Sequence, residues 1–175
     1  MQALTDAFAA IGAFMDQGGW VMYLIAALTF VMWTLVFERA VYFKGGLKGD
    51  VQQALESWEA RKERKSWNAH QIRAAMVSRM SAKINANMDM IVTLIALCPL
   101  MGLLGTVTGM IEVFSVMAYT GGGDAKSMAG GVSKATIPTM AGMVAALSGL
   151  FANTYLSRIA EREDHLFADH LTMDH

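Results

Sequence analysis

Three long stretches without a charged residue constrain this 175-residue chain more than any other feature. They run from Trp20 to Phe37, from Met90 to Ile111 and from Ala135 to Ser157. A helix needs about 20 apolar residues to cross a hydrocarbon core of about 30 Å. The chain is 54% hydrophobic and 17% charged, and a soluble helical fold of this size would have to bury three central helices. We therefore expect an all-α membrane protein with three transmembrane helices.

The basic residues are distributed unevenly between the segments that these three helices would separate. No Lys or Arg precedes Arg39, ten lie from Arg39 to Lys83, two are Lys126 and Lys134, and two are Arg158 and Arg162. Basic residues concentrate on the cytoplasmic side of a membrane protein. We therefore expect a multi-pass protein of the cell inner membrane with a periplasmic N-terminus and a cytoplasmic C-terminus. The first residues carry no basic cluster, so we expect no cleaved signal peptide.

This pattern divides the chain into seven segments. They are a periplasmic amphipathic helix (1–18), the first transmembrane helix (19–43), a cytoplasmic helical region (44–89), the second transmembrane helix (90–118), a short periplasmic loop (119–133), the third transmembrane helix (134–157) and a cytoplasmic tail (158–175). We expect Gly45 and Gly46 to break the first helix. An apolar stripe from Ile72 to Ile91 predicts one continuous helix from the cytoplasm into the second span, with a kink at Pro99.

Small residues form a ridge on each of the last two transmembrane helices. Their helical spacing predicts close backbone contact between neighbouring helices, through Gly102, Gly105 and Gly109 on one helix and Gly142, Ala146 and Gly149 on the other. Thr106 and Thr139 place a hydroxyl beside each ridge, so the helices could pack together and also border a polar route. The alternative is helix packing alone, because threonine is common at helix contacts in membranes.

Two charged residues flank these helices at their periplasmic ends. Glu112 follows Thr106 by six residues, about 9 Å, and Lys134 precedes Thr139 by five, about 7.5 Å. If the threonines share a level, the charges do too, and we hypothesise that Glu112 and Lys134 pair at the outer mouth, within or between subunits. The alternative is that each side chain extends separately to the interface.

Other kinds of site have little support in the sequence. The net charge of −1 gives no reason to expect nucleic-acid binding, and the single cysteine, Cys98, lies inside an apolar span as a packing residue. The histidines lack the spacing of a metal site, and no nucleophile lies beside a base. We expect no enzyme, no cofactor and no metal.

The two ridges carry a recognisable motif. Pro99-x-x-Gly102-Leu-x-Gly105-Thr106-Val-x-Gly109, followed by Gly131-Val-Ser-Lys-Ala-Thr-Ile-Pro-Thr139-Met-Ala-Gly142, resembles the MotA/TolQ/ExbB family of ion-driven inner-membrane motors. The short chain with three spans is most similar to the ExbB branch, whose members serve the TonB system. The resemblance covers the second and third spans.

The resemblance implies a ring, a homopentamer, in which the second and third spans surround a pore. Single-span partners of the ExbD or TolR type would stand in that pore, and proton flow would energise a TonB-like protein that drives outer-membrane uptake. The pore threonines of the family correspond to Thr106 and Thr139. A hydroxyl can orient a proton but cannot store charge, so the titrating carboxylate would belong to the partner.

One departure from the family and two alternatives stay open. Family members of this type usually place a Glu near the start of the third span, where this chain has Lys134, which leaves the route of proton entry open. The chain could serve envelope maintenance as TolQ does, or it could be a scaffold that conducts nothing. The sequence does not decide between proton and sodium.

Overall fold

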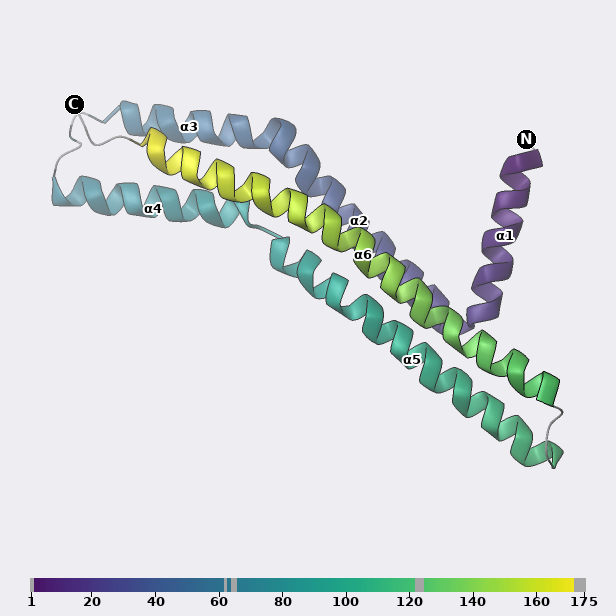
Figure 1. Ribbon diagram of the computed structural model, residues 1–175. Helices are drawn as coiled ribbons and strands as arrows, with labels where there is room; N and C mark the ends of the chain where they lie inside the picture. The colour runs from purple at the N-terminus through teal and green to yellow at the C-terminus, as the bar shows by residue number, and fades with distance from the viewer. Residues whose placement is uncertain (1, 62, 64–65, 122–124, 172–175) are drawn as a thin grey trace. The chain divides into compact units, whose positions relative to one another are not determined.

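The computed structural model describes residues 2–61, 63, 66–121 and 125–171, and within them the chain is all-helical (Figure 1). The elements in order are α1 (Gln2–Gly18), α2 (Trp20–Val41), the π-helix η1 (Tyr42–Gly46), α3 (Leu47–Glu59), α4 (Trp67–Ile84), α5 (Met88–Thr120) and α6 (Ala125–His170). Three helical stretches are long and apolar enough to cross a membrane: Trp20–Glu59, Trp67–Tyr119 and Met128–His170. The prediction of an all-helical chain with three such helices is confirmed.

The helices contribute to two compact units. The first contains Met1–Trp33 and Thr93–Leu150, and the second contains Thr34–Val92 and Phe151–His175. In the first unit, Val21, Met22 and Ile25 of α2 form a buried cluster, against which Met15 of α1 and Met101 of α5 pack. This cluster holds the start of α2 close to α5, the helix that carries the first glycine ridge.

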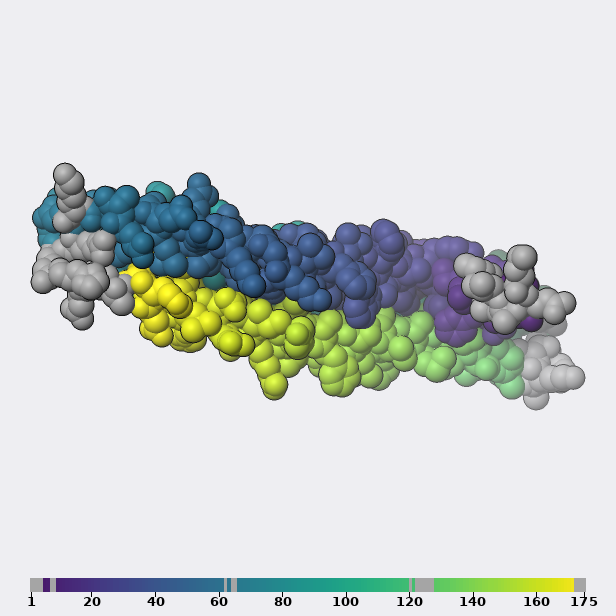
Figure 2. Space-filling model, turned by 90° about the horizontal axis from the view of Figure 1, so that it is seen from above, coloured from purple at the N-terminus to yellow at the C-terminus, as the bar shows by residue number. Residues whose placement is uncertain are grey.

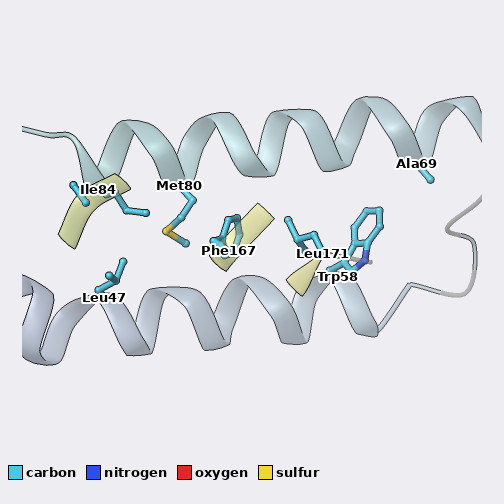
Figure 3. Close-up of a cluster of buried hydrophobic side chains, with 8 residues drawn as sticks. Leu47, Trp58, Ala69, Met80, Ile84, Phe167 and Leu171 are labelled. Carbon is cyan, nitrogen blue, oxygen red and sulfur yellow. The ribbon is translucent and has the colours of Figure 1, made fainter. Parts of the chain in front are cut away.

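The second unit has a larger core between α3, α4 and the C-terminal part of α6. Figure 3 shows Phe167 of α6 and Leu171, the residue after α6, between α3 and α4, close to Trp58 and Met80. Figure 2 shows the side chains of α3 and of this end of α6 side by side on one face. Because its C-terminal part packs into this core, α6 continues to His170, through most of the segment that the sequence analysis assigned to a cytoplasmic tail (158–175).

The Arg73 side chain caps the C-terminal end of α6. Its Nε donates to the Leu171 carbonyl at 2.7 Å, and its Nη2 donates to the Ala168 carbonyl, also at 2.7 Å. The last carbonyls of a helix have no partner inside the helix, and a guanidinium satisfies two of them while its charge complements the helix dipole. Arg73 therefore fixes the end of α6 against α4.

The predicted break at Gly45 and Gly46 is wrong. The chain continues from α2 into α3 through η1, and the Leu47 N–H bonds to the Tyr42 carbonyl, a step of five residues. A Cβ at Gly46 would lie 2.8 Å from Cδ2 of the Tyr42 ring. The glycine therefore makes room for the Tyr42 ring inside a widened helical turn, where the sequence suggested that the helix would end.

The prediction of one continuous helix into the second span is also wrong. α4 ends at Ile84 with Asn85 as its C-cap, and Asn87 has a φ of 63° before α5 begins at Met88. Asparagine adopts this left-handed conformation more readily than most residues. The backbone N–H of Asn85 and its side-chain amide both donate to the Ser81 carbonyl, at 2.9 and 3.0 Å. The apolar stripe continues across the break, so the pattern of apolar residues did not reveal it.

Candidate functional site

The two small-residue ridges bring the backbones of α5 and α6 together in the first unit, where the two helices run side by side (Figure 1). A Cβ at Gly102 would lie 2.8 Å from the Thr139 Cα, and a Cβ at Gly142 would lie 2.4 Å from the Cys98 carbonyl oxygen. Both distances are too short for real Cβ atoms, and the atoms in the way belong to the backbone. Only glycine permits this approach at Gly102 and Gly142.

The contact continues on both sides of this point. A Cβ at Gly109 would lie 2.7 Å from the Ala135 Cβ, and one at Gly105 would lie 2.4 Å from the Pro138 Cβ. Towards the other end, a Cβ at Gly149 would lie 2.4 Å from the Met32 sulfur of α2. Ala146 of the second ridge is half-buried. Five of the six ridge residues named from the sequence are thus glycines facing a neighbouring helix at close range.

The close approach places Thr106 and Thr139 in hydrogen-bond contact through their hydroxyl oxygens. Both hydroxyls also lie within reach of a single acceptor, the carbonyl of Gly102, at 3.2 Å for Thr106 and 2.9 Å for Thr139. The two hydroxyls have two protons between them. When one hydroxyl donates to Gly102 and the other donates to its threonine neighbour, both protons are used, and exchanging the two roles gives a second arrangement with the same partners.

This small polar site can pass or orient a proton but cannot hold a charge. Both threonines are half-buried, and apolar side chains follow on both helices. A hydroxyl accepts and donates hydrogen bonds, and its own titration lies far outside the physiological range. A carboxylate that approached the exposed side of the pair would gain a donor when one hydroxyl turned from its present acceptor, the Gly102 carbonyl or the other threonine, towards the carboxylate. A protonated carboxyl would find an acceptor in a hydroxyl oxygen. The site therefore fits the wall of a route for a charge carried by another group.

Glu112 and Lys134 lie on the wall of one cavity of about 530 Å³ between the start of α2 and the α5–α6 pair. Among the residues that the structure describes, no ion pair joins Glu112 to Lys134. The hypothesis that the two side chains pair at the outer mouth, within or between subunits, stays a prediction.

A polar cluster that the sequence pattern did not indicate lies at the other end of α2. Arg39 is 6% exposed, and its Nε and Nη2 donate to the two Glu38 oxygens at 2.8 Å each. Its Nη1 donates to the Lys83 carbonyl at 3.0 Å, and its guanidinium lies 4.9 Å from the centre of the Tyr42 ring. Arg39 therefore satisfies a carbonyl at the end of α4 while it remains paired, which permits its burial.

The same cluster holds Asp50 of α3. The Tyr42 hydroxyl donates to Asp50 at 2.7 Å, and the Lys83 ammonium lies 3.2 Å from its other oxygen. The hydrogen bond from Tyr42 and the nearby Lys83 lower the pKa of Asp50 below its ordinary value. In the sequence, these residues stand out only as charges that follow the first transmembrane helix. Such charges indicate which side of the membrane a segment lies on, but not which residues they contact. Arg39 and Asp50 both contact Lys83, close to the end of α4. That helix end, just before Asn87, was not evident in the sequence.

Residues 38–169 match the MotA/TolQ/ExbB proton channel family. The match covers more than half of the chain, and the chain belongs to this family. It is a family of channel and transport proteins, which confirms the expectation that the chain is not an enzyme.

Several curated proteins share part of the sequence. An ExbB-like biopolymer transport protein of Synechocystis is 36% identical over 97 residues, which are 54% of this chain and 38% of the relative. Biopolymer transport protein ExbB of Xanthomonas campestris is 34% identical over 83 residues, 47% of this chain and 33% of the relative. ExbB of Helicobacter pylori is 32% identical over 82 residues, 47% of this chain and 57% of the relative. The matches thus span about a third to just over half of the relatives' own lengths.

Proposed function

We propose that this chain is a stator subunit of an inner-membrane proton channel that converts the proton motive force into mechanical work. The observation that carries this proposal is the contact of the Thr106 and Thr139 hydroxyls beside the Gly102 carbonyl. Two antiparallel helices that approach so closely leave no room for a route between them in one chain. The route runs along the exposed side of the pair and is completed by other copies of the chain.

The proposed assembly is a ring, a pentamer as the family resemblance implies, with α5 and α6 around a central pore. A single-span partner of the ExbD type stands in the pore and contributes an acidic side chain. This carboxyl is protonated from one side of the membrane, passes the threonine pairs, and releases its proton to the other side. A charged carboxylate is costly in an apolar pore, and hydroxyls that donate to it reduce that cost.

The names of the relatives in Xanthomonas campestris and Helicobacter pylori, both biopolymer transport protein ExbB, support a role in transport. The resemblance to the ExbB branch makes the TonB system the proposed setting. In this role the turning or shifting partner energises a TonB-like protein that drives outer-membrane uptake. The proposed orientation follows the charge distribution, with the N-terminus in the periplasm and the basic region from Arg39 to Lys83 in the cytoplasm.

The test is reconstitution into vesicles with and without the partner, a co-encoded single-span protein with an acidic residue in its span. The measured quantity is proton influx under an imposed membrane potential, followed with an entrapped pH dye. We expect influx only when both proteins are present, and none when the partner's acidic residue is replaced by its amide. A complex that assembles fully but conducts no protons would support the scaffold alternative and overturn this proposal.

A further inference from the structure

The spacing of charged residues along α5 and α6 puts the cavity that Glu112 and Lys134 line at the expected edge of the hydrocarbon core. Trp20, the first residue of α2, lines it together with Glu112 and Lys134. Glu112 follows Asp89 by 23 residues, about 34 Å along a helix, and Lys134 precedes Arg158 by 24, about 36 Å. Both spacings match a hydrocarbon core of about 30 Å with a charge just beyond each edge. The cavity therefore straddles the boundary between acyl chains and headgroups.

Opposite charges face this cavity from two helices at nearly the same depth. Gly109 and Ala135 are in contact and mark one level on α5 and α6. Glu112 lies three residues beyond Gly109, away from the threonine pair, and Lys134 lies one residue beyond Ala135. Their backbones therefore differ in depth by only about 3 Å. Among the described residues neither side chain is in an ion pair, so the cavity offers a free carboxylate and a free ammonium.

The rest of the lining is mainly apolar. Val113, Val116 and Met117 contribute aliphatic surface, and the Trp20 ring, 56% exposed, lies at the rim. The volume of about 530 Å³ falls within the range of about 300–1,000 Å³ that is usual for small-molecule sites. An occupant must therefore present both a cation and an anion within a few ångströms and continue into an apolar part.

We infer that this cavity binds the headgroup of a zwitterionic phospholipid of the phosphatidylethanolamine class, with its phosphate at Lys134 and its primary ammonium at Glu112. The phosphate accepts charge-assisted hydrogen bonds from the lysine, and the ammonium donates them to the glutamate. The glycerol and the first acyl carbons lie against the valines. An anionic headgroup without an ammonium would leave Glu112 unpaired beside its negative charge. A choline headgroup carries a cation that has no N–H to donate.

Native mass spectrometry of the purified assembly tests this inference. The protein is stripped of lipid in mild detergent and titrated with dioleoyl phosphatidylethanolamine, phosphatidylcholine or phosphatidylglycerol. We expect phosphatidylethanolamine to be retained about tenfold more than the other two, the effect of about one charge-assisted hydrogen bond. Glu112→Gln removes this preference. Lys134→Gln lowers the retention of phosphatidylethanolamine and phosphatidylglycerol alike. The matched control, Glu161→Gln at an exposed glutamate that does not line the cavity, changes neither.

Several results would overturn the inference. Equal retention of all three lipids would show that the cavity does not select a headgroup, and a preference for phosphatidylglycerol would assign an anion site to Lys134 alone. If both variants lower the melting temperature equally in lipid-free detergent and lipid binding does not change, Glu112 and Lys134 pair directly. Displacement of phosphatidylethanolamine by the single-span partner would make the cavity a protein-binding site. None of these results bears on proton conduction at Thr106 and Thr139.

Discussion

Gly142→Ala is expected to separate α5 from α6 and prevent stable assembly. The added Cβ would lie 2.4 Å from the Cys98 carbonyl oxygen and 3.3 Å from the Gly102 Cα. Neither atom can rotate away, because both belong to the backbone, so one helix must move. Overpacking of a well-packed core costs about 1–3 kcal/mol, and a clash between rigid helices lies at or beyond the upper end of this range. Thermal unfolding in detergent and size-exclusion chromatography of the assembly measure the effect.

Gly130→Ala is the matched control for this variant. Gly130 lies on the same helix, and a Cβ there meets nothing within 4 Å. Because alanine favours a helix interior over glycine by about 1 kcal/mol, this change should leave the assembly intact or stabilise it slightly. If Gly142→Ala assembles and unfolds as Gly130→Ala does, the close contact between α5 and α6 is not essential for the fold.

Thr139→Val is expected to abolish most proton influx while the complex still assembles. Valine keeps the shape of threonine but removes the hydroxyl that contacts Thr106 and donates to the Gly102 carbonyl. Thr106 still supplies a hydrogen bond to that carbonyl, so little stability is lost. A hydrogen bond to a charged group contributes about 1.5–3 kcal/mol, so the passing carboxylate should be slowed by about 10- to 100-fold. The vesicle assay measures the loss of proton influx. Co-purification of the chain with an affinity-tagged partner shows whether the complex still assembles.

Thr136→Val is the matched control, because it removes a hydroxyl from α6 that does not belong to the threonine pair. Thr136 lies three residues earlier, is exposed, and donates to the Ser133 carbonyl of its own helix at 2.8 Å. We expect influx to be unchanged in this variant. A Thr139→Val complex that conducts as well as Thr136→Val would refute the role of the threonine pair.

The sequence predicted the parts of this molecule that depend on periodic patterns. Three charge-free stretches identified the three apolar helices, because length and hydropathy alone decide whether a helix can cross a membrane. Helical spacing put the glycines of α5 on one face, and in the structure that face meets the backbone of α6. Because the two antiparallel ridges pack against each other, Thr106 and Thr139 lie at the same level along the helix pair.

Local backbone chemistry was harder to predict. Gly46 suggested the end of a helix but instead accommodates the Tyr42 ring, because the effect of a glycine depends on which side chain needs its space. The helix breaks at Asn87, although the apolar residues keep their helical spacing across this point. The burial of Arg39 depends on a carbonyl of Lys83, 44 residues away, which only the tertiary structure brings near. Long-range polar contacts of this kind leave no periodic signal in one sequence.

The most direct test of the central claim asks whether water and small cations reach the threonine pair in the assembled complex. Cys98 is the chain's single cysteine, so Cys98→Ala gives a background without thiols in which Thr139→Cys can be probed with silver ions. An alkylating reagent is added after the silver ions, and a thiol that has bound silver is protected from it. The mass of the intact chain shows whether the alkyl group was added. Val144→Cys, on an apolar exposed face of α6, serves as the reference. We predict that Thr139→Cys reacts much faster than Val144→Cys. Equal or slower reaction at Thr139→Cys would contradict a wet route past the two threonines.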